Sequence, residues 1–382
     1  MIHSTLKQKQ FTVNLDGKPY ALLLGNGILT TAIIEVLNSK SNNRNIVIVF
    51  DTFFGKMIVD SLKTQLIKAG YVVYTHPLEA GKQNKTISEA IKIYDLLESN
   101  NLSRDSTIIA VGGGVIGDLV GFVASTYLRG INLIHVPTTM TAMIDSSIGG
   151  KVAINFRETI NAIGNYYHPI LNVIDFDFIK TLPAREFKSG LAEIIKCAII
   201  ADNDLFAYFE TQSNAVIERQ EEALLSVMSR AIEIKLEHVS GDVQEQGKRL
   251  KLNYGHTLGH AIEISTSMLG EVYRHGEGVA LGMVGAAYIA CKHFGLDKQI
   301  LKYHEDILRL YGLPVCVDAP GIGFDRLTLI EDCMANVNKD KKRKDGKLRF
   351  ILPRQIGNCE VCSDISDSLV KDAFQYVIGG KE

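Results

Sequence analysis

Short apolar segments alternate with longer amphipathic ones between residues 45 and 136. Four of the apolar segments are typical of strands: 45–50 (NIVIVF), 71–75 (YVVYT), 107–111 (TIIAV) and 131–136 (INLIHV). Two of the segments between them, near 55–69 and 86–99, have the apolar spacing of helices. Strands that are apolar on both faces need cover on both faces, so the pattern predicts a parallel sheet with helices on each side.

The rest of the chain divides into an N-terminal extension of this pattern and a helical second half. Residues 11–15 and 20–24 flank an Asp16-Gly17 turn, which predicts a hairpin, and a helix is expected near 29–40. From about residue 184 the apolar spacing becomes helical. Because 382 residues exceed one ordinary core, we predict an α/β domain over residues 1–180 and an all-α domain over 181–382.

Composition excludes several classes of function. The formal net charge of -2 gives no reason to expect nucleic acid or an acidic membrane surface as a partner. No apolar run is long enough to span a bilayer, and the first ten residues have no apolar core like that of a signal peptide. We therefore expect a cytoplasmic protein with reduced cysteines. Cys359 and Cys362 form a CxxC, which we interpret as two cysteines on a late strand in preference to a redox or metal site.

A glycine-rich loop follows the third of the four strands. Gly112, Gly114 and Gly117 have the G-x-G-x-x-G spacing between a strand and an apolar helix. Glycines there let the backbone approach a pyrophosphate, which the helix N-terminus attracts. We interpret the loop as a dinucleotide or phosphate site. No acidic residue stands about 20 positions further on, so Asp51, which closes the first of the four strands, is the candidate for the ribose hydroxyls.

A loop-rich segment follows the strand 131–136. It contains hydroxyls, Asp145, the pair Gly149-Gly150 and Lys151. Loops at strand ends are where α/β enzymes place ligands. The alternative interpretation is a plain surface connection.

The stretch RLKLNYGHTLGHAIE, residues 249–263, is predicted to be one helix. Arg249, Asn253, His256 and His260 would then share one face, which is costly to bury unless they meet ligands, a metal or one another. Two histidines four apart have the spacing of zinc proteases, but Thr257 stands where those enzymes need a Glu. A metal site remains possible if a third ligand comes from elsewhere.

Glu193 and Lys196 lie three apart inside an otherwise apolar run. Such pairs are commonly surface ion pairs, but the apolar neighbours indicate that this one is at least partly enclosed. Glu193, His256 and His275 can supply three metal ligands and leave a position open. Positive charge for an anionic substrate is available from Lys151, Lys196, Lys235, Arg249 and Lys341. Together with the nucleotide loop, these residues predict redox chemistry at an alcohol carbon of a phosphorylated or carboxylated molecule.

At these residues the sequence closely resembles the 3-dehydroquinate synthases, of the sugar-phosphate cyclase superfamily. The resemblance lies in segments 112–130, 136–151, 181–196, 249–263 and 274–283. It implies a Rossmann-like N-terminal domain, a helical C-terminal domain, NAD, and one divalent metal, zinc or cobalt. It also implies conversion of the sugar phosphate 3-deoxy-D-arabino-heptulosonate 7-phosphate (DAHP) to 3-dehydroquinate in the shikimate pathway to aromatic amino acids. The implied steps are oxidation, phosphate elimination, re-reduction, ring opening and aldol closure.

The resemblance also assigns roles to individual residues. Glu193, His256 and His275 are implied to bind the metal, and His260 to assist proton movement. The implied catalytic set consists of Lys196, Lys235, Arg249, His260, Asp145 and Asn253. The implied substrate-binding set consists of Lys151, Asn161, Lys235, Arg249, Asn253, Lys341 and, in a homodimer, Arg129 of the partner subunit. The implied NAD-binding set consists of Lys85, Gly113, Gly114, Asp118, Thr138, Thr139, Asp145, Lys151, Phe178, Thr181, Leu182 and Glu186, to which we add Asp51.

Three positions depart from the family pattern. Lys82 stands where the family usually has an acid, Ile160 stands where it commonly has a Lys, and Phe53 occupies a position that is polar in some members. They leave room for a paralogue acting on a DAHP analogue such as amino-DAHP. A sedoheptulose phosphate is disfavoured because that sugar has no carboxylate for Arg249. One rival is a metal-dependent polyol dehydrogenase, a family that shares the two-domain fold and a glycine-rich loop but usually has an Asp where Glu193 stands. Another is a non-catalytic sugar-phosphate-binding protein, which the intact Glu193, His256, His275, Lys196 and Arg249 disfavour.

Overall fold

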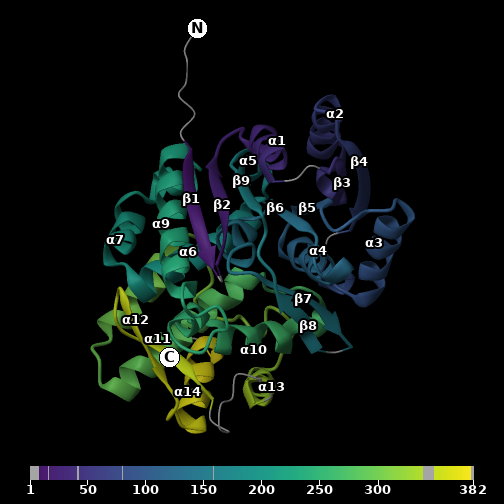
Figure 1. Ribbon diagram of the computed structural model, residues 1–382. Helices are drawn as coiled ribbons and strands as arrows, with labels where there is room; N and C mark the ends of the chain where they lie inside the picture. The colour runs from purple at the N-terminus through teal and green to yellow at the C-terminus, as the bar shows by residue number, and fades with distance from the viewer. Residues whose placement is uncertain are drawn as a thin grey trace. The chain divides into compact units, whose positions relative to one another are not determined.

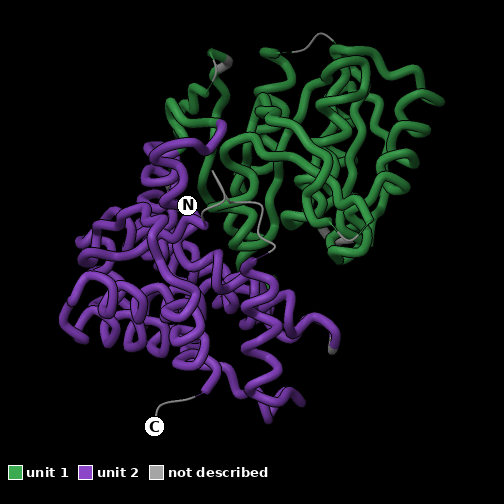
Figure 2. Tube along the Cα trace, turned by 90° about the horizontal axis from the view of Figure 1, so that it is seen from below, with its two compact units in different colours: residues 1–182, 239–243 green, residues 183–238, 244–382 purple. Residues whose placement is uncertain are grey.

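The computed structural model describes residues 8–15, 17–40, 43–79, 81–157, 159–338 and 348–379. The chain forms two compact units, shown in Figure 2. Unit 1 consists of Met1–Leu182 and Val239–Val243, and unit 2 of Pro183–His238 and Gln244–Glu382. The predicted Asp16-Gly17 turn lies partly outside the described residues, since Asp16 is not among them.

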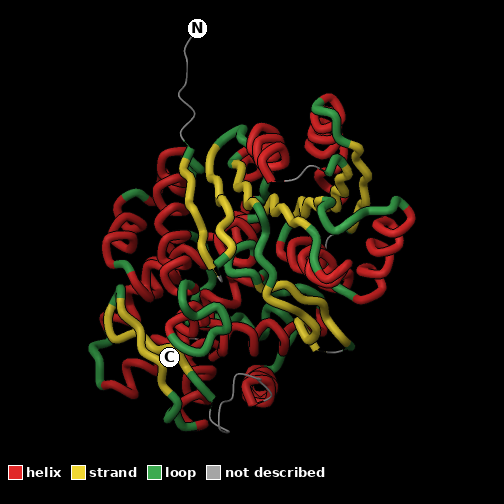
Figure 3. The backbone as a smooth tube through the Cα atoms, in the orientation of Figure 1, coloured by secondary structure: helices red, strands yellow, loops and turns green. Residues whose placement is uncertain are grey.

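Unit 1 is built on a seven-stranded sheet, drawn in Figures 1 and 3. Its strands are, in spatial order, β1 (Lys9–Leu15), β2 (Lys18–Gly25), β9 (Leu171–Asp175), β6 (Asn132–Pro137), β5 (Thr107–Gly112), β3 (Asn45–Asp51) and β4 (Val72–Leu78). Only the β1–β2 pair in this sheet is antiparallel. The predicted parallel sheet with an N-terminal hairpin is therefore confirmed.

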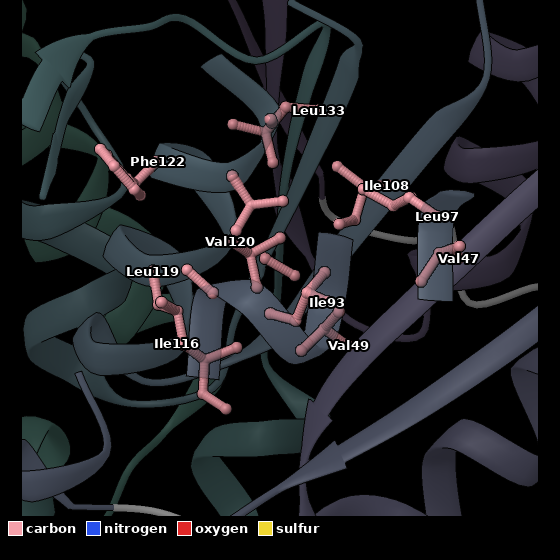
Figure 4. Close-up of a cluster of buried hydrophobic side chains, with 14 of the residues drawn as sticks. Val47, Val49, Ile93, Leu97, Ile108, Ile116, Leu119, Val120, Phe122 and Leu133 are labelled. Carbon is pink, nitrogen blue, oxygen red and sulfur yellow. The ribbon is translucent and has the colours of Figure 1, made fainter. Parts of the chain in front are cut away.

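Helices cover both faces of this sheet. They are α1 (Leu29–Lys40), α2 (Asp60–Lys68), α3 (Ile87–Ser99), α4 (Gly114–Thr126) and α5 (Asp177–Thr181), with α1 and α2 on one side and α3 and α4 on the other (Figure 1). On the second side, Val47 and Val49 pack with Ile93 and Val120 in one buried cluster (Figure 4). The alternate residues of β3 are equally buried, as expected for a strand apolar on both faces.

Two local predictions in unit 1 need correction. The segment near 55–69 does not begin as a regular helix: a 3-10 turn (Thr52–Phe54) and a π-helical turn (Gly55–Val59) precede α2. The loop-rich segment after β6 contains a π-helical turn (Ala142–Ser146) and leads into a second hairpin, β7 (Lys151–Phe156) with β8 (Thr159–Tyr166). Seven of the eight residues of β8 are exposed, so the strand has none of the apolar alternation that identifies half-buried strands.

Unit 2 is mostly helical, as predicted. Its helices are α6 (Ala184–Ala201), α7 (Asn203–Thr211), α8 (Ser213–Ile217), α9 (Glu221–Val239), α10 (His256–Thr266), α11 (His275–Phe294), α12 (Gln299–Leu310), α13 (Arg326–Asn338) and α14 (Asp367–Gly379). Helix α11 contacts α6, α10, α12 and α14, and most of its residues are buried. A helix that is apolar on nearly all sides belongs in the centre of a core. Among the described residues, every helix is too short or too polar to span a bilayer.

A small hairpin, β10 (Phe350–Gln355) with β11 (Asn358–Cys362), completes unit 2. Cys359 and Cys362 both lie on β11 and are buried, as the strand interpretation predicts. Burial raises the pKa of both thiols, that of Cys362 to about 11. Thiolate chemistry is therefore disfavoured at this CxxC.

Candidate active site

The predicted single helix over residues 249–263 is wrong, because the backbone breaks at Gly255. Residues Lys248–Asn253 form 3-10 turns, and α10 begins only at His256. Gly255 has φ +77°, and a Cβ there would lie 2.7 Å from the carbonyl oxygen of Val279. His256 and His260 still share a face of α10, but Arg249 and Asn253 belong to the preceding segment.

Four side chains from three helices of unit 2 converge at the start of α10. Oε1 of Glu193 on α6 lies 3.2 Å from Nε2 of His275 on α11 and 3.6 Å from Nε2 of His256 on α10. Nitrogen atoms of His256, His260 and His275 all lie within 4.8 Å of one another. Oε1 of Glu193 is buried and has no hydrogen-bond partner among the described residues. A buried carboxylate oxygen facing two imidazole nitrogens fits a divalent cation.

Close contacts between helices bring these side chains together. A Cβ on Gly276 would lie 1.8 Å from the carbonyl oxygen of Ser189, so α11 begins in direct contact with α6. A Cβ on Gly282 would lie 1.8 Å from the carbonyl oxygen of Gly255. Larger residues at either position would separate the helices that contain the four side chains.

Hydrogen bonds orient two of the imidazoles. Nδ1 of His256 lies 3.1 Å from the carbonyl oxygen of Tyr254, and Nδ1 of His275 lies 3.3 Å from Oε1 of Glu263. Both partners accept, so the proton belongs on Nδ1, and in the neutral ring Nε2 keeps its lone pair. Both Nε2 atoms can therefore face a shared cation together with Glu193.

Strong charges surround this cluster. Burial opposes ionisation of Glu193, but the ion-paired Lys196 and the positive charge of His275 hold its pKa well below the ordinary range. Burial opposes the charge on His275, but Glu193 and Glu263 raise its pKa to about 10. The two carboxylates that stabilise a proton on His275 are the same charges that would attract a metal ion.

The geometry allows two sets of three metal ligands. One is the predicted set of Glu193, His256 and His275, and the other replaces Glu193 by His260, to which the family resemblance assigns proton movement. The three predicted ligands thus lie together, and their role stays a prediction.

Among the other predicted residues of unit 2, three are buried cations and one is an amide that contacts an acid. Lys196, Lys235 and Arg249 are each no more than 5% exposed. Asn253 donates a hydrogen bond of 2.6 Å to Glu245, a residue that no sequence motif singles out. Glu263 was also missed, because an acid on a helix is normally solvated and gives no signal of its own.

The predicted nucleotide-binding residues of unit 1 gather at the carboxyl ends of adjacent strands. Register pairs of Phe50 with Val111 and of Gly112 with Pro137 bring Asp51, Gly113 and Thr138 to one edge of the sheet. Strand order reverses here, since the chain runs from β3 outward to β4 and returns to β5. Helix α4 starts at Gly114, whose Cβ would lie 3.1 Å from Oγ of Ser146. Reversal points of this kind are where doubly wound sheets bind ligands.

One further predicted residue of unit 1, Lys85, contacts two others. Lys85, which is 7% exposed, donates to the carboxylate of Asp118 and to the amide oxygen of Asn161. Burial raises the pKa of Asp118, and the charge of Lys85 opposes that rise. Asp118, which is assigned to NAD, and Asn161, which is assigned to the phosphate, thus both accept a hydrogen bond from Lys85.

The remaining predicted residues are placed as follows. Thr139 precedes the π-helical turn that contains Asp145, and Lys151 is the exposed first residue of β7. Phe178 is buried, with its ring centroid 5.5 Å from that of Phe54. Arg129 has a left-handed backbone with φ +65°. Thr181 ends α5, Leu182 follows that helix, and Glu186 lies in the first turn of α6. Lys341 lies outside the described residues.

Comparison with known proteins gives a consistent family. Residues 75–189 match the family model of the 3-dehydroquinate synthase N-terminal region, and residues 190–343 that of the C-terminal region. A 3-dehydroquinate synthase of Crocosphaera subtropica is 38% identical over 371 residues, covering 96% of this chain and 98% of the relative. One of Rippkaea orientalis is 41% identical over 361 residues, covering 94% of this chain and 91% of the relative.

Solved structures of related enzymes have the same fold. A 2-epi-5-epi-valiolone synthase of Streptomyces hygroscopicus, with NAD+ and Zn2+ bound, is 27% identical with a TM-score of 0.83, covering 94% of this chain and 96% of its own. A 2-deoxy-scyllo-inosose synthase complexed with carbaglucose-6-phosphate, NAD+ and Co2+ is 25% identical with a TM-score of 0.85, covering 96% of this chain and 99% of its own.

Proposed function

We propose, on the premise that this chain belongs to the 3-dehydroquinate synthase family, that it converts DAHP to 3-dehydroquinate and phosphate. In enzyme classes this is a carbon–oxygen lyase that also closes a ring. The observation that supports the chemistry most strongly is the position of Glu193 Oε1 within 3.6 Å of two imidazole nitrogens. A carboxylate and two imidazoles are the ligands of many catalytic metals, with a position left open for substrate.

We assign the cation to Glu193, His256 and His275, and NAD to the carboxyl edge of the sheet in unit 1. When bound, the cation would polarise a substrate hydroxyl, and NAD would accept a hydride and later return it. Zinc or cobalt is expected, because related cyclases contain them. Glu193 is preferred to His260 as third ligand because its Oε1 is buried and has no hydrogen-bond partner among the described residues.

Buried cations of unit 2 would bind the substrate. Arg249 is the candidate for the carboxylate, since a guanidinium binds a carboxylate through two parallel hydrogen bonds. Lys196 and Lys235 would hold ring hydroxyls together with Asp145, and Lys235 would also face the carboxylate. Their low exposure strengthens these contacts, because water competes less for each charge.

A second set of residues would bind the phosphate. It consists of Lys151, Asn161, Asn253, Lys341 and, in a homodimer, Arg129 of the partner subunit. The proton lost during elimination would pass to the departing phosphate, and His260 would assist its movement. A histidine suits that role because its ordinary pKa lies near neutrality. We also propose the homodimer itself, and a cytoplasmic location.

At the NAD edge, Asp51 would accept hydrogen bonds from ribose hydroxyls, and Gly113 and Gly114 would let the pyrophosphate approach the N-terminus of α4. In the same unit, Asp118 lies near the start of α4, Thr138 and Thr139 follow β6, and Lys85 follows the 3-10 turn of Lys82–Asn84. Lys82 is exposed and lies in a 3-10 turn, so the reversed charge there is expected to alter NAD affinity more than chemistry.

One assay tests the proposal. Zinc-loaded protein is incubated with DAHP and a catalytic amount of NAD, while phosphate, 3-dehydroquinate and NADH are followed together. We expect stoichiometric phosphate and 3-dehydroquinate with no net NADH. If a polyol is supplied in place of DAHP, steady NADH formation would instead establish a dehydrogenase. Turnover of amino-DAHP alone would establish a paralogous cyclase, and no turnover of any sugar phosphate would establish a binding protein.

A further inference from the structure

We propose that Glu263 is a positioning residue of the cation site, which fixes the ring of His275 and raises the basicity of its Nε2. The inference rests on the proposed function, because it presumes that His275 binds a metal. Oε1 of Glu263 lies 3.3 Å from Nδ1 of His275, and Nε2 of the same ring lies 3.2 Å from Oε1 of Glu193. The imidazole is thus held between two carboxylates.

The bond to Glu263 determines what the opposite nitrogen can do. A carboxylate accepts, so the Nδ1 atom must donate, and Nε2 of the neutral ring is left with a lone pair directed toward Glu193. A negative charge on the Nδ1 side also raises the electron density of the ring and strengthens its bond to a metal. Glu263 is mostly buried, with a side chain 11% exposed, so water screens this effect little.

A glycine on the neighbouring helix provides the space for this carboxylate. A Cβ on Gly278, in the first turn of α11, would lie 2.6 Å from Oε1 and 2.7 Å from Cγ of Glu263. The three nearest atoms to that Cβ all belong to Glu263. Gly278→Ala would therefore displace the carboxylate while its charge remains in the protein.

The second imidazole is held differently. Nδ1 of His256 lies 3.1 Å from the carbonyl oxygen of Tyr254, a backbone group that no substitution removes. Of these two orienting contacts, only the one made by Glu263 can be deleted by changing a side chain. Its loss should weaken cation binding without removing a ligand.

The test measures zinc affinity by competition with a chromogenic chelator in wild type, Glu263→Ala, Glu263→Gln and Gly278→Ala. We expect a loss of about 10- to 100-fold for Glu263→Ala. Gly278→Ala should also lose affinity, and Glu263→Gln should lose less, since its amide oxygen can still accept from Nδ1. Glu331→Gln is the matched control, because Glu331 is an exposed acid on α13, a helix that contacts α10, and it should bind zinc like the wild type.

Melting temperatures with and without zinc provide a second readout. A positioning role predicts that the zinc-induced rise shrinks in Glu263→Ala and Gly278→Ala while the metal-free melting temperature changes less. Wild-type zinc affinity in both variants would overturn the inference. His275→Ala separates the two proposals: if it also binds zinc like the wild type, the cation site itself is wrong, and if it alone loses zinc, only the role of Glu263 is wrong. Should Glu263→Ala fail to fold, Gly278→Ala and Glu263→Gln decide the question.

Discussion

Replacing Glu193 by Gln should destabilise the metal-free protein far more than an ordinary loss of an ion pair. The side chains of Glu193 and Lys196 are 1% and 2% exposed, so the change leaves a lysine charge in an almost water-free site. Breaking one partner of a buried pair costs about 3–5 kcal/mol. The destabilisation has an upper limit, because Lys196 can release its proton instead of remaining charged. Releasing a proton at pH 7 from a lysine of ordinary pKa costs about 4.6 kcal/mol. We therefore expect a loss of about 3–4.6 kcal/mol in the free energy of unfolding.

The assay is urea unfolding in chelated buffer, followed by circular dichroism, with hydrogen exchange of α6 to localise the change. Two units need not unfold together, so the local measurement is required. Glu89→Gln is the control: Glu89 and Lys92 have the same spacing of three, but the lysine side chain is 58% exposed, and loss of this pair should cost under about 1 kcal/mol.

A double variant distinguishes stability from metal binding. Glu193→Gln combined with Lys196→Met removes both charges, so most of the stability should return while zinc affinity stays low. If Glu193→Gln unfolds at the same urea concentration as Glu89→Gln, the pair is not an enclosed charge pair and the reasoning fails.

Three further predictions concern other parts of the molecule. Burial lowers the pKa of His304 to about 4, so between pH 6.5 and 4 the unfolded chain takes up a proton that the folded chain does not; the free energy of unfolding should fall by about 3 kcal/mol across that range. His304→Gln should remove this part of the pH dependence in urea titrations, and an unaltered pH profile would exclude it. Arg249→Ala should weaken substrate binding by about 2–5 kcal/mol, measured from KM and calorimetry, because it strands a desolvated carboxylate; unchanged kinetics would remove Arg249 from the site. Gly114→Ala should weaken NAD binding by about 1–3 kcal/mol in equilibrium dialysis, since its Cβ would crowd Ser146 where the pyrophosphate must approach; unaltered affinity would place NAD elsewhere.

The architecture was predictable because its signal is local. Strands β3, β4, β5 and β6 are short apolar runs, and the helices expected between them repeat their apolar residues at helical spacing, so this α/β pattern can be read without tertiary information. The parallel strand β9 was not predicted. The hairpin β7–β8 was missed for the opposite reason: β8 is mostly exposed, and no apolar alternation identifies it.

The break before α10 depends on contacts that the sequence does not display. Gly255 reads as a glycine inside a helical pattern until the carbonyl of Val279 on α11 is seen 2.7 Å from its missing Cβ. Likewise, Asp51 could be named as a ribose ligand from its place after a strand. Its position beside the glycine loop follows from β3 being the neighbour of β5, which is a property of strand order.

Contacts between distant residues were the least predictable part of the candidate site. Lys85 meets both Asp118 and Asn161, residues 33 and 76 positions away. Glu263 and His275 could each be seen in the sequence, but only the packing of α10 on α11 shows that one orients the other. Sequence motifs selected the ligand types, and helix packing determined which side chains meet.

The measurement that tests the central claim most directly is an anomalous difference map, recorded at the zinc edge, from crystals of the zinc-loaded protein. The proposed site predicts one peak bonded to Oε1 of Glu193 and to Nε2 of both His256 and His275, at about 2.0–2.2 Å from each. A peak bonded to His256, His260 and His275 without Glu193, or no peak near these residues, would contradict it.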